Sequence, residues 1–342
     1  MLLDGRVFTA DPAHPLVEAL AVRGDRIVAV GTTAEVTALA GASTTRRSLG
    51  GRTVIPGLND AHAPDPDLDA PGIAARSQAL AAAGVTSMQW FAGTRPVADT
   101  ARALVAADPA QRVRVFRMPR PGPDDETIDS RPHLPPQPTL RIDVRGMGFR
   151  LGAADQSRID QAVHWAYGSE DLLAIEPADR AALAAYVEAV ERGGLAEVWR
   201  SKRPRIEEPG LEAVDLASRI ASLGMVVVAR PAFSVPLASL VKAGVPLALG
   251  ADGSLTPFDA VAWAISIERG AEALTVGQAL TAFTRGSATA ELSERDKGHL
   301  SVGALADLVV LDEDPFAGDA ATVGRTRSLL TIIGGRVVHD VL

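Results

Sequence analysis

The sequence is poor in several kinds of residue, and each shortage excludes a class of site. It contains no cysteine, which rules out disulfides, thiolate metal sites and cysteine nucleophiles. It has no run of about 18 apolar residues, so no membrane-spanning helix is predicted. The net charge is −8, and no cluster of basic residues indicates a nucleic-acid site. We therefore expect a small-molecule substrate or ligand as partner, with no nucleic acid and no membrane.

Lysine is also scarce, since the chain contains only Lys202, Lys242 and Lys297. No lysine precedes position 202, which excludes any site in that part of the chain that needs a lysine side chain. The first residues, "MLLDGRVFTA", reach Asp4 and Arg6 too early for the apolar core of a signal peptide. A cytoplasmic protein is therefore expected.

What remains is the composition of a globular protein with a sizeable core. Hydrophobic residues make up 47% and charged residues 22% of the 342 residues, which suits one large domain or two of ordinary size. Both ends of the chain contain short alternating runs separated by glycine turns, as in "VRGDRIVAVG" and "SLLTIIGGRVVHD". We predict a small β-sandwich domain built from residues 1–54 and 292–342, and a second domain over 55–291.

The middle of the chain alternates apolar runs typical of buried strands with amphipathic helical patterns. The runs predicted as strands are 53–58, 85–91, 112–118, 140–149, 195–200, 204–207, 224–230 and 245–251. This alternation predicts an α/β fold, a (β/α)8 TIM-type barrel that is shortened or distorted, with a doubly wound open sheet as the alternative. The Pro-rich segment 119–138 is predicted to be a long loop at the barrel mouth.

Several motifs resemble the amidohydrolase superfamily, in particular the branch called amidohydrolase family 3. "TVIPGLNDAHA" resembles the first barrel strand of that family, "RPRIEE" resembles its "RIEH" motif, and "KGHLSVGALADLVVLDEDPF" nearly repeats its tail. The resemblance is weakest over 92–195, and the family's usual insert after the first strand is absent. It implies hydrolysis assisted by a divalent metal, often zinc, with ligands from the carboxyl ends of the barrel strands.

Little of the metal-ligand pattern implied by this resemblance is present. His62 matches the first histidine of strand one, but Pro64 replaces the second and has no donor atom. Gly148 stands where strand four would carry a lysine. We expect no cofactor and no metal centre of the family type, and zinc or another divalent metal only in a reduced site of His62, Glu208 and Asp252.

The same resemblance assigns the remaining candidate residues. The predicted strand 195–200 places Trp199 or Arg200 where strand five of the family has a histidine. Glu208 replaces the histidine of strand six, and Asp252 matches the aspartate of strand eight. We predict that Glu208, Trp199 and Arg200 contribute to substrate binding.

Strands one and eight adjoin in a closed barrel, so His62 and Asp252 are predicted to be neighbours. A carboxylate that orients an imidazole suits general acid–base catalysis. The alternative is that both residues are remnants of a lost metal site, hydrogen-bonded in a polar barrel mouth. The two glutamates of "RIEE" could likewise serve only to neutralise Arg203 and Arg205.

The leading functional hypothesis is a hydrolase of an amide or cyclic-amide C–N bond that uses His62 and Asp252 as acid–base residues, with an altered or absent metal site. One alternative is a metal-free barrel enzyme that catalyses isomerisation, cyclisation or elimination. Another is a catalytically inactive relative that binds a small molecule or a partner protein. The substrate is not identified by the sequence, and a homodimer is expected because members of the family are often dimers.

Overall fold

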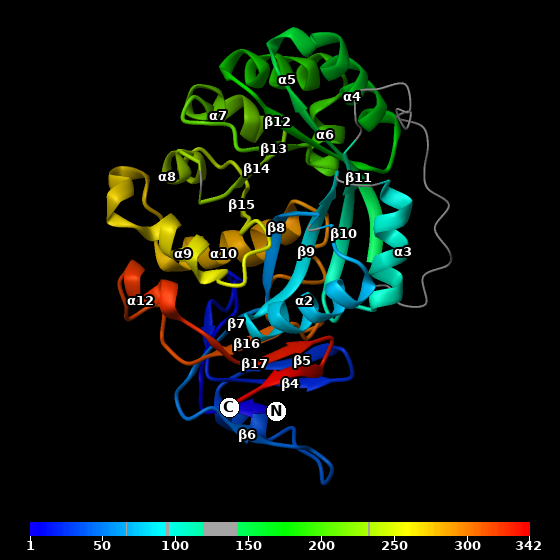
Figure 1. Ribbon diagram of the computed structural model, residues 1–342. Coiled ribbons are helices and arrows are strands. Elements are labelled where there is room, and N and C mark those ends of the chain that lie inside the picture. Colours follow the sequence, from blue (N-terminus) through cyan, green and yellow to red (C-terminus); the bar gives the residue numbers. More distant parts are fainter. Residues whose placement is uncertain (66, 94–95, 119–141, 232) are drawn as a thin grey trace.

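An eight-stranded parallel sheet forms the centre of the molecule and curves into a nearly closed barrel surrounded by helices (Figure 1). The computed structural model describes residues 1–65, 67–93, 96–118, 142–231 and 233–342. The strands follow the order β15-β14-β13-β12-β11-β10-β9-β8, so each strand lies beside its neighbour in the sequence. This arrangement confirms the predicted TIM-type barrel. The predicted loop 119–138 lies outside the described residues.

The barrel strands are β8 (Leu58–Pro64), β9 (Val85–Ala92), β10 (Arg112–Arg117), β11 (Ile142–Leu151), β12 (Leu172–Pro177), β13 (Arg205–Glu207), β14 (Val226–Ala229) and β15 (Leu247–Leu249). The helices between and after them are α2 (Ala70–Ala82), α3 (Val97–Ala107), η1 (Ala153–Asp155), α4 (Gln156–Gly168), α5 (Arg180–Arg192), α6 (Ala196–Lys202), α7 (Ala213–Ser222), α8 (Leu237–Lys242), α9 (Phe258–Ile265), η2 (Ile267–Glu272), α10 (Val276–Thr281), η3 (Ala282–Gly286) and α11 (Ser287–Thr289). No helix in the described ranges is both long and apolar enough to cross a membrane.

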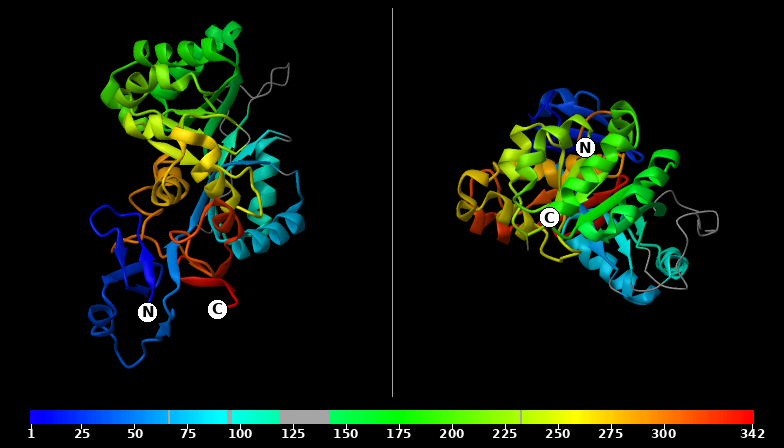
Figure 2. Two further views of the ribbon diagram at one scale, coloured as in Figure 1. Left: turned by 90° about the vertical axis from the view of Figure 1, so that its left-hand side faces the viewer. Right: turned by 90° about the horizontal axis from the view of Figure 1, so that it is seen from above.

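Two smaller sheets lie below the barrel, and one of them combines strands from both ends of the chain (Figure 2). One contains β5 (Arg26–Gly31), β4 (Ala19–Arg23), β1 (Leu2–Leu3) and β6 (Arg47–Ser48). The other contains β18 (Arg336–Asp340), β17 (Ser328–Ile333), β16 (Leu308–Leu311), β7 (Thr53–Pro56), β2 (Arg6–Phe8) and β3 (Leu16–Val17). Short helices α1 (Thr33–Thr37) and α12 (Ala320–Arg325) complete the chain. Because β7 pairs with both β2 and β16, the two termini share one sheet, as predicted.

Three strand predictions need correction. The predicted strand 53–58 is two elements, because the chain leaves the small sheet after β7 and enters the barrel at β8. Gly57 makes this crossing, and a Cβ on it would lie 2.1 Å from the hydroxyl of Thr86. The predicted strand 195–200 is wrong: these residues belong mainly to helix α6. The fifth barrel strand is instead β12, whose short apolar run "LLAI" was not predicted as a strand.

The barrel strands are buried on both faces, which explains their apolar sequences. Every residue of β9 and of β14 is buried, as expected for parallel strands covered by helices outside and filled by side chains inside. The inside of the barrel carries an aromatic stack in which the ring of Phe91 on β9 lies 4.7 Å from that of Phe116 on β10. Two polar side chains of the barrel interior, His62 and Arg205, pack against these rings.

The seam between the first and last barrel strands is closed by a side chain. Within the described residues no backbone ladder joins β15 to β8. Instead the carboxylate of Asp60 on β8 accepts hydrogen bonds from the backbone N–H of Ala251 at 2.8 Å and of Gly253 at 2.7 Å. It also accepts one from the N–H of His62 at 3.1 Å. Burial raises the pKa of Asp60 to about 6, although these three N–H groups and His62 act to lower it.

Helix η3 supports the seam from the other side. Gly286 lies so close to β15 that a Cβ at this position would be 2.0 Å from the carbonyl oxygen of Leu247. The hydroxyl of Ser287 on α11 donates to the carbonyl of Leu249 at 3.1 Å. The last barrel strand pairs with β14 along one edge, and it is also held by a side chain of β8 and by a closely packed helix.

We expect Asp60→Asn to destabilise the protein and to open the seam. Both carboxylate oxygens of Asp60 accept hydrogen bonds, whereas the NH₂ group of asparagine cannot accept one. At least one buried backbone N–H would therefore lose its acceptor, which costs about 1–3 kcal/mol. Chemical denaturation should show a lower free energy of unfolding, and hydrogen exchange should show faster exchange of the Ala251 and Gly253 amides. Unchanged stability together with unchanged protection of both amides would contradict this role of Asp60.

Candidate functional site

The polar residues of the barrel gather at the carboxyl ends of its strands, centred on His62 near the end of β8. The imidazole Nδ1 of His62 lies 3.0 Å from a carboxylate oxygen of Glu207, the last residue of β13. The ring also stacks on Phe91 at a centroid distance of 4.1 Å and an angle of 17°. The two contacts fix the orientation of the imidazole and leave Nε2 as the ring nitrogen with no hydrogen bond to the described residues.

Glu207 is in turn held by the arginine two residues before it on the same strand. Arg205 Nε donates to the second carboxylate oxygen of Glu207 at 2.8 Å, and its other nitrogens donate to Gln89 and to the carbonyl of Ala61. The guanidinium carbon lies 4.7 Å from the ring centre of Phe116. Arg205 and Glu207 are both buried, so the cation has exchanged water for three protein acceptors and an aromatic ring.

These contacts decide the charge of Glu207. Burial alone would raise the pKa of Glu207, but the positive charge of Arg205 and the hydrogen bond with His62 outweigh burial and lower it below its ordinary value. A carboxylate that stays ionised beside an imidazole fixes the tautomer with the proton on Nδ1 and stabilises the imidazolium when it forms. Arg205, Glu207 and His62 are therefore arranged as a chain in which each group positions the next.

A second arginine joins two other strand ends. Arg230 follows β14, the strand that lies between β13 and β15. Its Nε donates to Glu208 at 2.8 Å and its Nη1 donates to Asp252 at 2.6 Å. Its guanidinium carbon lies 4.9 Å from the ring centre of Phe233. One guanidinium thus bridges the carboxylates that follow strands six and eight of the barrel.

The two carboxylates on Arg230 differ in their surroundings. The Asp252 side chain is 41% exposed, whereas that of Glu208 is 1% exposed. Burial raises the pKa of Glu208 to about 8, because it outweighs the attraction of Arg230. Oε2 of Glu208 has no hydrogen-bond partner among the described residues. A neutral Glu208 near pH 7 would carry a proton that it can donate to a bound molecule.

His62 and Arg230 lie close together because Gly250 has no side chain. A Cβ on Gly250 would be 3.0 Å from Cβ of His62 and 3.2 Å from Cγ of Arg230. The chain of groups that ends at His62 and the bridge formed by Arg230 therefore belong to one site.

The prediction that His62 pairs with Asp252 is wrong. His62 binds Glu207, and Asp252 binds Arg230. The reason is the direction of the side chains: Glu207 reaches back across the barrel interior to the imidazole, while Asp252 sits on a left-handed turn with φ of 51° that presents it to Arg230. The interpretation that the glutamates of "RIEE" neutralise Arg203 and Arg205 is right for Glu207 and Arg205. Arg203 binds Glu294 instead.

The reason for assigning Trp199 and Arg200 to substrate binding is lost, because they lie on helix α6 and not at a strand end. Trp199 is fully buried in the main core, with its ring 5.2 Å from that of Tyr167. Arg200 donates to the carbonyl of Ser222 at 3.0 Å.

The strand end that corresponds to strand five carries Glu176, which binds Arg150 at 2.6 Å. Glu208, in contrast, lies in the site.

The sequence motifs alone do not mark Glu207 and Arg230 as functional residues. Their positions do give an indication, because each stands at the carboxyl end of a strand whose predicted bounds are nearly correct. In a parallel barrel the side chains at these positions converge on one end of the fold. Charged residues there are better candidates than charged residues on a helix such as Arg200.

The residues present do not fit a family-type metal centre. The part of the chain that the structure describes contains no group of three histidine, aspartate or glutamate side chains placed to hold a metal ion. A lysine at position 148 would require its neighbours to move, since a Cβ there would be 2.5 Å from the sulfur of Met118 and 3.1 Å from the ring of Phe91. The carboxylates of Glu208 and Asp252 are bound to a guanidinium, which would repel a divalent cation placed between them.

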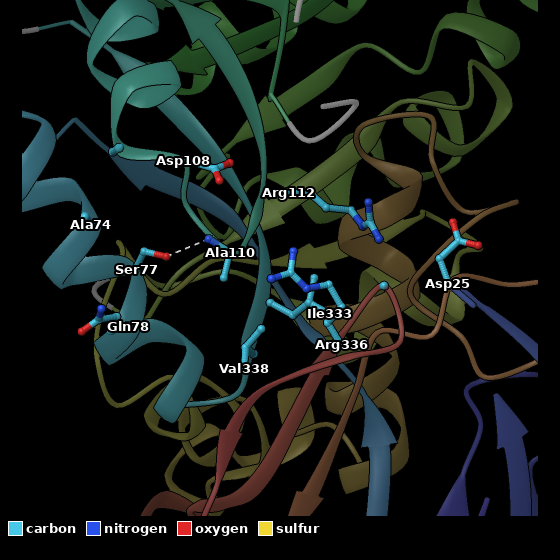
Figure 3. Close-up of a pocket in the computed structure, with 12 residues that line it drawn as sticks. Asp25, Ala74, Ser77, Gln78, Asp108, Ala110, Arg112, Ile333, Arg336 and Val338 are labelled. Atoms are coloured by element: carbon cyan, nitrogen blue, oxygen red, sulfur yellow. Dashed lines mark hydrogen bonds between the residues drawn. The ribbon is translucent and has the colours of Figure 1, made fainter. Parts of the chain in front are cut away.

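A separate hollow lies away from these residues, between the barrel helices and the small sheets (Figure 3). It has a volume of about 450 Å³, and its polar lining includes Asp25, Ser77, Arg112 and Arg336. Ser77 accepts a hydrogen bond from the N–H of Ala110, which closes one wall. None of His62, Glu208 or Asp252 lines this hollow, so it is distinct from the site at the strand ends.

Two known proteins resemble this chain in sequence over short stretches. The putative amidohydrolase YtcJ of Bacillus subtilis (strain 168) is 31% identical over 115 residues, which cover 30% of this chain and 22% of that protein. Protein LONG AFTER FAR-RED 3 of Arabidopsis thaliana is 36% identical over 62 residues, which cover 18% of this chain and 11% of that protein. The chain thus spans less than a quarter of the length of these curated relatives.

Solved structures resemble the chain over nearly its whole length. A triazine hydrolase variant superimposes with a TM-score of 0.74 and 18% identity, covering 99% of this chain and 94% of the other. An adenosine deaminase from Xanthomonas campestris with bound zinc gives a TM-score of 0.72 and 17% identity, covering 99% and 93%. These similarities show the fold. Residues 63–339 also match the model of the amidohydrolase family, and because this match covers most of the chain, the protein belongs to that family.

Proposed function

We propose that this protein hydrolyses a C–N bond of a small amide, cyclic amide or related nitrogen heterocycle, and that its own side chains carry the acid–base steps. Membership of the amidohydrolase family supports a hydrolase. Two structural relatives are named after nitrogen heterocycles, a triazine and adenosine, which supports this substrate class. The observation that carries the proposal is the imidazole of His62 held on Glu207, with Nε2 left free of hydrogen bonds to the described residues.

His62 is the proposed general base. Glu207 accepts a hydrogen bond from Nδ1 at 3.0 Å, so the lone pair is on Nε2, and the stacking on Phe91 prevents the ring from turning. An ionised Glu207 also stabilises the imidazolium that forms when Nε2 takes a proton. A base positioned in this way contributes about 10²–10⁴-fold to a reaction rate.

Glu208 is the proposed general acid, and Arg230 is the proposed oxygen-binding group. A carboxyl with a pKa of about 8 is mostly protonated at pH 7 and can give its proton to a leaving nitrogen. Nη2 of Arg230 makes no hydrogen bond to the described residues and can donate to the carbonyl oxygen of a substrate as negative charge develops on it. In this proposal Asp252 is a positioning residue that holds Arg230, in place of the acid–base role first predicted for it.

The proposed reaction balances with these groups alone. His62 Nε2 takes a proton from a water molecule while the water oxygen bonds to the carbonyl carbon. Glu208 gives its proton to the nitrogen as the C–N bond breaks, which releases a carboxylic acid and an amine, or one ring-opened product from a cyclic amide. His62 then releases its proton to solvent, and Glu208 regains one.

A second candidate function is binding without catalysis. Arg205 pairs with Glu207, and Arg230 pairs with Asp252 and with Glu208, which is mostly protonated at pH 7, so the charges of the site are compensated within the protein. Such a site could recognise a polar small molecule and release it unchanged. The two candidates differ in whether His62 is needed for turnover or only for affinity.

Substitution of His62 or Glu207 tests the proposed chemistry. A panel of cyclic amides and nitrogen heterocycles would be incubated at pH 7 with a chelator present, and product formation would be followed by mass spectrometry. We expect turnover by the wild type, and a loss of about 10²-fold or more in His62→Gln and Glu207→Gln. His164→Gln is the matched control, because His164 is an exposed residue of α4.

Two results would overturn the proposed chemistry. If the chelator abolishes turnover and zinc restores it, the reaction depends on a metal. If the folded protein binds members of the panel without converting any, binding without catalysis is the better account.

Glu208 predicts a particular dependence of stability on pH. Its pKa is about 8 in the folded protein, above the ordinary value of 4.5, so the folded state binds the proton more tightly than the unfolded state does. The stabilisation is complete below pH 4.5 and is lost as the pH rises towards 8. Over pH 6.5–8 the free energy of unfolding of Glu208→Gln should therefore fall less than that of the wild type, by up to ~1.4 kcal/mol per pH unit. If the free energy of unfolding falls equally with pH in the two proteins, Glu208 is ionised in the folded state.

A further inference from the structure

We infer that Arg230 is the resident cation of the site: its guanidinium holds the carboxylates after strands six and eight together and keeps a divalent metal out of the space between them. This inference builds on the proposed function, because it takes the strand ends around His62 as the site. Its test measures metal binding and needs no turnover.

The position of Arg230 in the sheet makes this role possible. It follows β14, which pairs with β13 on one side and with β15 on the other. From this central strand the guanidinium reaches Glu208 on one side at 2.8 Å and Asp252 on the other at 2.6 Å. A single group therefore contacts both of the carboxylates that the family resemblance places at ligand positions.

The backbone supports the same reading. Glu208 has φ of 53° and Asp252 has φ of 51°, a left-handed conformation that residues with a Cβ seldom adopt. For Asp252 the conformation is held by Asp60, whose carboxylate accepts from the N–H groups of the residues on either side, Ala251 and Gly253. Both strands therefore turn sharply where their carboxylates meet Arg230, so the bridge is built into the backbone as well as the side chains.

Removal of the guanidinium would leave groups that suit a metal. In the present structure His62, Glu208 and Asp252 are not placed to hold a metal ion together, and Arg230 holds both carboxylates. Once these carboxylates are free to move, they and Nε2 of His62 would supply the three nitrogen and oxygen ligands that zinc accepts. Cβ of His62 and Cγ of Arg230 both lie beside Gly250, so the two side chains start from the same part of the barrel mouth. With the positive charge in place, a divalent ion meets both electrostatic repulsion and carboxylates that are already bound.

The experiment measures the binding of Zn²⁺ to the full chain by calorimetry, with metal analysis after desalting. The variants are Arg230→Met, which keeps the length of the side chain but not the charge, and Arg230→Met/Asp252→Asn, which removes one candidate ligand again. Arg219→Met is the matched control, because Arg219 forms a two-bond ion pair with Glu191 on the surface. Near-ultraviolet circular dichroism would show which variants are folded.

We expect Arg230→Met to bind one Zn²⁺ per chain, at least about 100-fold more tightly than the wild type or Arg219→Met, and the double variant to lose most of this gain. A folded Arg230→Met that gains no affinity would overturn the inference. So would a wild type that binds one Zn²⁺ which Asp252→Asn loses. If neither Arg230 variant folds, zinc binding by the wild type and by Asp252→Asn is compared instead. Equally weak zinc binding by these two proteins supports the inference.

These outcomes separate the inference from the proposed function. A gain of zinc binding in Arg230→Met would support the resident cation even if no substrate of the panel is hydrolysed. Hydrolysis by a wild type that needs zinc bound through Asp252 would overturn the inference while leaving a hydrolase in place.

Discussion

The bridge from Arg230 to Glu208 and Asp252 determines the character of the site. Three neighbouring strands end in these residues, and the guanidinium ties their ends together. In a barrel of this family the same end would be expected to gather ligands around a metal ion. Here a covalently attached cation occupies that position, and with Glu208 protonated it balances the charge of Asp252. A fixed cation of this kind also offers hydrogen bonds to a substrate oxygen.

The other polar contacts hold this bridge and His62 in fixed positions relative to each other. Asp60 ties the end of β15 to β8 across the seam, so Asp252 and His62 cannot move independently. Arg205 holds Glu207, which in turn holds the imidazole. The groups that would touch a substrate are thus each supported by a buried ionic or hydrogen-bonded partner. Such support is what preorganises a catalytic site.

The fold was predictable because several barrel strands are short apolar runs between amphipathic helices, and β14 and β15 are clear examples. The segment 195–200 failed because a six-residue run with alternating character suits a strand or a helix equally well, and packing of Trp199 in the core decides for the helix. His62 lies near the end of β8, and Glu208 and Asp252 follow β13 and β15. Their partners were not predicted, because contacts between His62 and Glu207 or between Arg230 and two carboxylates depend on side-chain directions that spacing in the sequence does not encode.

The central claim is that a guanidinium, and no metal ion, stands between the carboxylates of this barrel. The most direct measurement is a crystal structure of the wild-type protein soaked in zinc chloride, with an anomalous difference map collected at the zinc edge. The account predicts density for the Arg230 side chain between Glu208 and Asp252, with no anomalous peak there. A strong peak bounded by His62, Glu208 and Asp252, with Arg230 displaced, would contradict it.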